Sequence, residues 1–492
     1  MKIKPNYLAL LTISALISSC GLLGPDYTKP NVTAPTNWTS KDSLSVNEST
    51  NIAEMAWWRK FNDPQLNGLI ESAFANNNNL QMAMGNMLQA QAQLGKVNMG
   101  WVPTANIGAG GAIGQMFDGS FTNHSSNPIP STSNNFNNFN SYGYGIMPSY
   151  TLNVFEQIKQ GEIATLNLAM QQQAVYAVRL GIISQVSSSY FALLGFHRQL
   201  EIQEETLRDA EELRKLTLIQ YEKGSISDLK VSALDQYIAT IKANIPILKT
   251  NITNAENALQ LLTNQNPAKI KLDNNFNNIS TKNIIPINLP SDILKTRPDV
   301  VAAEYQLQLA NANIGAVRSM FFPSINLTGA LGQGTMNLAN LFSAGGDFWM
   351  AQLGAAMPFF NMSLYKEVDI AKSKYYTAYY NYVQTVRSAF SDVDNGLSAH
   401  DSSTSNYNEQ TTALNRAQDI YKNSNKRYQK GAIAYVDLIG TKLNIDYSLA
   451  NQNKAKMNQL NSLVNLYQAL GGGYMAESSL TQVKKFNDGH DI

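Results

Sequence analysis

The residues best suited to acid–base or metal chemistry are few in this chain and widely spaced. Its four histidines, His124, His197, His400 and His490, have no mutual spacing that would put two of them on one helix face. Glycine patterns that hold phosphates between a strand and a helix are absent, because the stretch from Gly108 to Gly114 lies in a predicted strand region. No pairing of a nucleophile with a base is apparent either. The sequence therefore predicts no metal site and no enzyme.

The single cysteine, Cys20, has a different chemistry. Lys2 and Lys4 precede an apolar run from Leu8 to Ile17, which is the layout of a secretory signal and is too short to span a membrane. The run ends in Ile-Ser-Ser-Cys20-Gly, which resembles a bacterial lipobox. We therefore expect a signal peptide over 1–19 and a covalent lipid on Cys20. The alternative is an ordinary signal peptide with a stray cysteine.

Composition narrows the remaining classes of function. Charged residues make up 15% of the 492 residues and the net charge is +1, whereas ordinary soluble domains carry about 25% charged residues. This balance does not indicate the basic surface that a nucleic-acid-binding protein needs. Sixteen methionines could line a copper or silver path, but Met82, Met84 and Met87 are better explained by helix packing. After the signal no run of eighteen apolar residues follows, so strands must cross any membrane.

A repeat organises the chain. The stretch Tyr428-Gln-Lys-Gly431-Ala-Ile matches Tyr221-Glu-Lys-Gly224-Ser-Ile, and the two lie 207 positions apart. The same offset relates Lys366 to Lys159 further up the chain. Two copies of one helical hairpin are predicted. We expect a lipid-anchored extended segment over 20–64, a first repeat over 65–290, a second over 291–473, and a tail over 474–492.

Each repeat carries two predicted strands. Apolar residues alternate from about Ala105 to Ile113, from Tyr142 to Val154, from Ile325 to Leu331 and from Trp349 to Met357. Their length and alternation are typical of membrane barrel strands. A loop rich in Asn, Ser and Pro is expected from Gly114 to Asn140. Closing a barrel takes about eight strands, so four require oligomerisation.

Helices are predicted on either side of the strands. One is expected from Gln65 to about Met99. In the returning arm of the first hairpin, apolar residues from Val231 to Leu262 keep the spacing of a coiled-coil seam, which Pro246 should kink or interrupt. Arms of about sixty residues would be ~90 Å long. Helix is expected to resume at Pro298.

Short motifs in a fixed order carry a resemblance to a known family. They are Gly24-Pro-Asp-Tyr27, Trp57-Trp-Arg-Lys-Phe-Asn-Asp-Pro64, Arg297-Pro-Asp-Val300, Ile314-Gly315 and Phe322-Pro323. Together they resemble the outer-membrane efflux lipoproteins of the TolC superfamily. The resemblance implies an α+β membrane protein in which four strands per chain contribute to a trimeric transmembrane β-barrel, continuous with a long periplasmic α-helical barrel.

The resemblance also indicates functional residues at the two hairpin tips. Asp437 matches the first of two acidic positions that narrow the periplasmic mouth, Val436 lies where relatives place an apolar constriction, and Gly440 replaces the second acid. The alternative for Asp437 is a helix N-cap. Lys230 occupies the equivalent place in the first hairpin. Exposed tip residues are expected to dock an adaptor protein: Gly224, Ser225, Ile226, Gly431, Ala432 and Ile433.

The function implied is that of a passive exit channel in the Gram-negative outer membrane. Its expected partners are two further copies of itself, a periplasmic adaptor, an inner-membrane pump of the resistance-nodulation-division (RND) type, and outer-membrane lipid. Two alternatives remain open: an exit duct for type I protein secretion, and a structural coiled-coil lipoprotein without a pore. If the tips move, the second and less regular hairpin is expected to move further.

Overall fold

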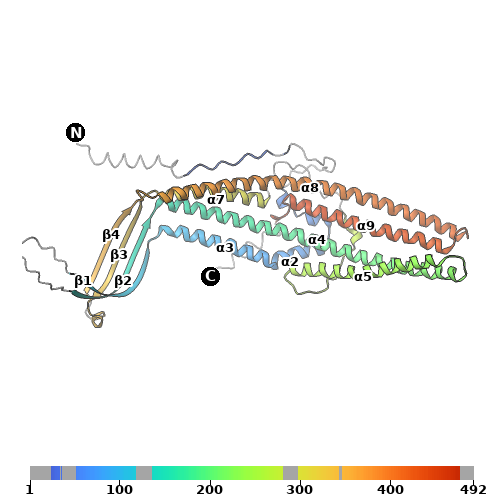
Figure 1. Cartoon of the computed structure of the whole chain (residues 1–492), viewed down its shortest axis with the longest axis horizontal. Helices are drawn as coiled ribbons and strands as arrows, with labels where there is room; N and C mark the ends of the chain where they lie inside the picture. Colours follow the sequence, from blue (N-terminus) through green and yellow to red (C-terminus); the bar gives the residue numbers. More distant parts are fainter. Residues whose placement is uncertain are drawn as a thin grey trace, which may run out of the picture. The chain divides into compact units, whose positions relative to one another are not determined.

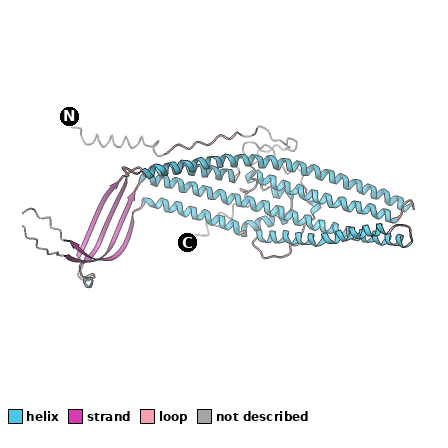
Figure 2. Ribbon diagram, in the orientation of Figure 1, coloured by secondary structure: helices cyan, strands magenta, loops and turns pink. Residues whose placement is uncertain are grey.

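The computed structural model describes residues 24–33, 35, 51–117, 136–280, 297–342 and 346–476. The predicted signal peptide 1–19, the lipidation residue Cys20 and most of the tail lie outside these residues. Among the described residues helix predominates and four strands form one sheet (Figures 1 and 2). The main elements are α2 (Pro64–Asn76), α3 (Asn78–Asn98), β1 (Thr104–Phe117), β2 (Phe136–Leu152), α4 (Val154–Glu222), α5 (Asp228–Leu262), α7 (Pro298–Ser319), β3 (Ser324–Thr335), β4 (Gly346–Ala356), α8 (Met362–Gln429) and α9 (Tyr435–Ala469).

The internal repeat is confirmed. Helices α4 and α8 contain 69 and 68 residues, and the returning helices α5 and α9 contain 35 each. At ~1.5 Å per residue, α4 is about 100 Å long. Even a surface ion pair recurs, since Lys159 contacts Glu162 at 2.8 Å and Lys366 contacts Asp369 at 3.1 Å.

Four antiparallel strands form one sheet in the order β1-β2-β3-β4, so β1 and β4 are its edges. The strands begin and end differently from the prediction. β1 continues to Phe117 and β2 begins at Phe136, inside the stretch predicted as loop, and Val154 opens α4 instead of ending a strand. The residues at these strand ends, several of which are polar, still pair across the β1–β2 ladder, from Ile113 with Asn140 to Phe117 with Phe136.

The register places apolar residues in a row across all four strands. Ile107 pairs with Ile146, Ile146 with Leu331, and Leu331 with Trp349. All four side chains are exposed: Ile107 by 86%, Ile146 by 46%, Leu331 by 61% and Trp349 by 78%. One position earlier in β2 the register joins Gly145 to Gly332, where a Cβ added to Gly145 would lie 2.5 Å from the Leu331 carbonyl oxygen. Large apolar groups therefore form an exposed row on one face of the sheet, while glycines permit close strand approach.

Two compact units make up the chain. One has Gln91–Asn167 and Gln308–Thr377 as its main segments and contains the sheet; the other has Leu168–Leu307 and the chain from Ala378 as its main segments. Each unit takes segments from both halves of the repeat, because α4 and α8 run through both. The predicted boundary between residues 290 and 291 stays a prediction.

The core of the helical unit forms around the tryptophan motif. Trp57 is fully buried, its ring stacks on Tyr467 at 4.6 Å between centroids, and its Nε1–H donates to the Gly472 carbonyl at 3.3 Å. Asp63 is also fully buried and caps α2, accepting from the backbone of Gln65 and Leu66 at 3.0 and 3.1 Å. These contacts explain why the motif combines aromatic residues with an Asn-Asp-Pro helix start.

The expectation of one helix from Gln65 to Met99 is wrong. Asn77 separates α2 from α3, with ψ at 121°. Its side-chain oxygen accepts from the backbone of Asn79 and Leu80 at 3.0 and 3.2 Å, and its Nδ2 donates to the Leu262 carbonyl at 2.9 Å. Short polar side chains of this kind compete with helical hydrogen bonds and favour helix caps. The run of four asparagines therefore ends one helix and starts the next.

Other helical predictions hold. Ile238, Ile241 and Leu259 of the seam are buried, and α7 starts at Pro298. Pro246 does not divide α5, which is continuous from Asp228 to Leu262. By length and composition one described helix, α4, could cross a membrane, although 56% of its most apolar stretch is buried inside the protein.

Candidate functional site: the hairpin tips and their junction

The two hairpin tips close in the same way. Gly224 and Gly431 each have φ at 70°, in the left-handed region that favours glycine. At the first tip, Gly224 N–H donates to the Tyr221 carbonyl at 2.8 Å and Ser225 N–H donates to the Gln220 carbonyl at 2.9 Å. This pair of bonds is the Schellman motif. The second tip repeats it, with Gly431 N–H to Tyr428 O at 2.8 Å and Ala432 N–H to Arg427 O at 2.9 Å.

The helices that leave the tips start differently. In the first hairpin Ser227 is the N-cap, and its Oγ accepts from Leu229 N–H at 3.0 Å. In the second the N-cap is Ala434, whose side chain cannot accept a hydrogen bond. Asp437, the third residue of α9, accepts from Ala434 N–H at 3.3 Å instead. The alternative that Asp437 is itself the N-cap is therefore wrong, although its carboxylate stabilises the helix start from inside the first turn.

The predicted tip residues are accessible. Asp437, Ser225, Ala432 and both turn glycines are exposed, and Val436, Gly440, Ile226 and Ile433 are half-buried. Leu229, beside the first turn, is 74% exposed. The tips therefore present both apolar and polar groups to solvent.

Helix α9 of the second hairpin contacts α4 of the first at three levels. Tyr435 Oη donates to Glu212 Oε1 at 2.9 Å, next to the tip. Further along, Lys442 Nζ donates to Asp209 Oδ1 at 2.8 Å. The buried Asn453 then donates to the Gly195 carbonyl at 3.0 Å. These polar contacts join the two hairpins along their length.

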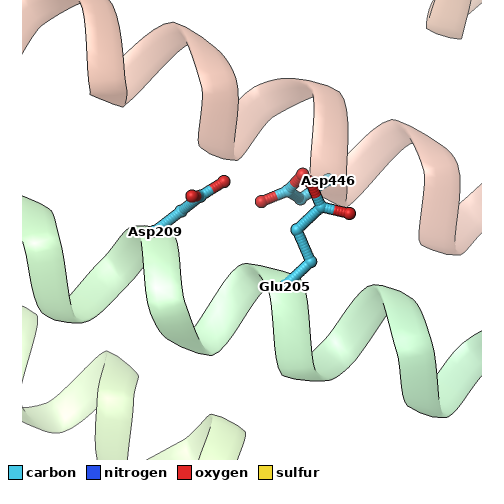
Figure 3. Close-up of side chains that lie close together, drawn as sticks. All are labelled: Glu205, Asp209 and Asp446. Carbon is cyan, nitrogen blue, oxygen red and sulfur yellow. The ribbon is translucent and has the colours of Figure 1, made fainter.

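The middle level contains three carboxylates that point toward one another (Figure 3). Glu205 and Asp209 lie one turn apart on α4, and Asp446 lies one turn beyond Lys442 on α9; the closest oxygens of the three acids are within 4.8 Å of one another. Burial, and then the neighbouring Asp209 carboxylate, raise the pKa of Asp446 to about 7. The cluster leaves no signal in the sequence, because only packing of α4 against α9 brings the acids together.

A sequence profile of the outer membrane efflux protein family matches residues 69–265 and 289–472. The chain belongs to this family. It is thus an outer-membrane efflux protein, as the ordered motifs predicted.

Similar proteins agree with this assignment along nearly the whole chain. The probable outer membrane lipoprotein SilC of Salmonella typhimurium is 30% identical over 478 residues, covering 95% of this chain and 99% of SilC. The cation efflux system protein CusC of Escherichia coli K12 is 29% identical over 477 residues, covering 96% of this chain and 100% of CusC.

Solved structures agree as well. The open state of the Neisseria gonorrhoeae MtrE outer membrane channel has a TM-score of 0.79 at 26% identity, covering 92% of this chain and 98% of MtrE. The Campylobacter jejuni CmeC outer membrane channel also has a TM-score of 0.79, at 24% identity, covering 96% of this chain and 99% of CmeC. The second likeness supports the fold alone.

Proposed function

We propose that this efflux protein is the passive exit channel of a tripartite efflux system and works as a homotrimer. The observation that carries the proposal is the four-stranded sheet, whose edges are β1 and β4 and whose apolar row from Ile107 to Trp349 is exposed. An open sheet edge cannot stand in hydrocarbon, because its backbone groups would have no hydrogen-bond partners. Pairing β4 of one copy with β1 of the next satisfies both edges and closes a barrel.

In this proposal the hairpin tips form the periplasmic end of the channel. Asp437, Val436 and Gly440 of each copy narrow the aperture, and the exposed turns dock a periplasmic adaptor. The adaptor links the channel to an inner-membrane RND pump, which supplies the energy. The exposure of the Asp437 carboxylate and of the turn residues supports these roles. The lipid on Cys20 anchors the trimer in the outer membrane.

Conductance in planar bilayers tests the aperture. Asp437→Asn removes one carboxylate per copy, and we expect it to lower cation selectivity and change single-channel conductance. The control is Asp228→Asn, which removes an exposed acid from the first turn of α5 in the other hairpin. Equal effects of both variants would contradict a special role for Asp437.

Cysteine cross-linking tests the assembly. The only native cysteine is Cys20, so cysteine pairs placed along β1 and β4 report on contacts between copies. We expect cross-linked species up to a covalent trimer and none larger. A protein that forms no conducting species and no β1–β4 cross-link would instead be a structural lipoprotein. Unchanged sensitivity of a deletion strain to dyes, detergents, antibiotics and metal ions would contradict the efflux role.

A further inference from the structure

The acidic cluster between the two hairpins contains more negative charge than its neighbours neutralise. Asp446 is 2% exposed and Asp209 is 5% exposed, and the Oδ2 atom of each is buried without a hydrogen-bond partner among the described residues. Burying an unpaired carboxylate oxygen is costly. Figure 3 shows these carboxylates directed toward each other and toward Glu205.

The charge balance indicates which kind of cation would suit the cluster. Glu205, Asp209 and Asp446 carry three negative charges, and Lys442 supplies one positive charge at 2.8 Å from Asp209 and 3.8 Å from Glu205. Tyr237 of α5 also faces the cluster: burial, and then the Asp446 carboxylate, raise the pKa of its hydroxyl. A single proton or a monovalent ion would leave the cluster negative, whereas one divalent cation would neutralise it.

We propose that Glu205, Asp209 and Asp446 form a binding site for a hard divalent cation of the size of Ca²⁺, which joins α4 of the first hairpin to α9 of the second. All three ligands are carboxylates, and oxygen ligands suit Ca²⁺, Mg²⁺ and Mn²⁺. Two oxygens bound to one Ca²⁺ at 2.3–2.6 Å can be about 5 Å apart, but only about 4 Å apart around Mg²⁺. The three oxygens lie within 4.8 Å of one another, so all three can bind one ion of the size of Ca²⁺.

The surroundings leave the site accessible. The Glu205 side chain is 44% exposed, so an ion can enter from solvent and keep water ligands on that side. Lys442 bonds to Oδ1 of Asp209 and leaves Oδ2 free for the ion. The sequence predicted no metal site because the histidines lack ligand spacing and the methionines are better explained by helix packing; the proposal places a site on carboxylates instead. The proposal goes beyond the channel function and does not depend on it.

Terbium luminescence tests the site in the purified, metal-stripped full-length protein at pH 7.5. Tb³⁺ stands in for Ca²⁺, and its emission is excited through tyrosine; Tyr237 is the nearby donor. We expect saturable emission that Ca²⁺ displaces at lower concentrations than Mg²⁺. Asp446→Asn should weaken Ca²⁺ affinity at least about tenfold, since even groups that only hydrogen-bond to a metal ligand contribute tenfold or more.

Two control variants distinguish a cation site from a purely structural ion pair. Asp419→Asn removes an acid whose side chain is 63% exposed on α8, and it should leave the Ca²⁺ affinity unchanged. Lys442→Met removes the competing ammonium and should tighten Ca²⁺ binding about tenfold or more. If Lys442 served only a structural ion pair, Lys442→Met would destabilise the protein and Ca²⁺ would not restore its stability.

Thermal unfolding gives a second readout. Ca²⁺ should raise the midpoint of the wild type by several degrees but leave Asp446→Asn unchanged, because a ligand stabilises only the state that binds it. Without Ca²⁺, Asp446→Asn should be at least as stable as the wild type, since it removes a buried unpaired charge. If Ca²⁺ neither displaces Tb³⁺ nor shifts the midpoint, or if Asp446→Asn binds Ca²⁺ like the wild type, the cluster holds only a shared proton and the proposal fails.

Discussion

Replacing each of two glycines near the second tip by alanine should change the local stability in opposite directions. Gly431 has φ at 70°, and a Cβ added there would meet no atom within 4 Å. Gly431→Ala therefore causes no clash and costs only the left-handed conformation, about 1 kcal/mol. Gly440 lies inside α9, and a Cβ there also meets no atom within 4 Å. Gly440→Ala should stabilise the helix by about 1 kcal/mol, because alanine has the higher helix propensity.

Hydrogen–deuterium exchange measures this difference locally. The reporting amides are those of the turn and of the first turn of α9, including Ala432 and Leu438, whose N–H groups donate to Arg427 and Ala434. A change of about 1 kcal/mol in the opening free energy alters exchange about fivefold. We expect exchange about fivefold faster in Gly431→Ala and about fivefold slower in Gly440→Ala.

The first tip supplies the matched control. Gly224→Ala should speed exchange around its own turn by the same factor and leave the second tip unchanged, because the two turns have the same φ and the same hydrogen bonds. Slower exchange in Gly431→Ala would refute the left-handed closure of the tip. Faster exchange in Gly440→Ala would refute its placement in a regular helix.

Substitutions at three further sites test the helical unit. Trp57→Ala should lower the free energy of unfolding by about 3–5 kcal/mol, measured by denaturant titration, because it empties a fully buried site stacked on Tyr467. Arg179→Met should leave that free energy unchanged or raise it, whereas Arg179→Ala should lower it. Arg179 is 1% exposed, and its guanidinium lies 5.2 Å from the centroid of the Phe74 ring but has no hydrogen-bond partner among the described residues, while methionine keeps the packing against Phe74. Burial lowers the pKa of His400 below its usual 6.5, so the folded state binds fewer protons than the unfolded state and loses stability as the pH falls below about 6.5. Between pH 7.5 and pH 5 the thermal unfolding midpoint of the wild type should therefore fall further than that of His400→Gln. Equal decreases in the two proteins would contradict this account.

The contacts of the short motifs explain why their order along the chain was informative. Arg297, in the motif Arg-Pro-Asp-Val, bonds to Asp299 at 2.7 Å, to Asp392 at 3.0 Å and to the Ala469 carbonyl at 2.9 Å. Asp63, in the tryptophan motif, also accepts from Tyr190 Oη at 2.8 Å. Each motif residue therefore positions segments that are far apart in the sequence. The structure supplied those partners.

The sequence by itself determined the repeat, the helical hairpins, the four strands and the two turn glycines. These features depend on local rules: strand alternation, the spacing of apolar residues along a helix, and the need for glycine at positive φ. The same local rules predicted the ends of the helices and strands poorly. The asparagine run before Leu80 looked like helix, and the polar ends of β1 and β2 looked like loop, because capping and strand pairing depend on partners elsewhere in the chain.

Only the tertiary structure decided which charges meet. Glu205 and Asp209 are separated from Asp446 by more than two hundred residues, and each alone looks like an ordinary solvated acid on a long helix. Their counterparts in the other half of the repeat are Thr412, Arg416 and Ala239, so the cluster breaks the symmetry that organises the chain. Electrostatic interactions act through space and strengthen with burial. The packing of α4 against α9 therefore created a site that no spacing along the chain could reveal.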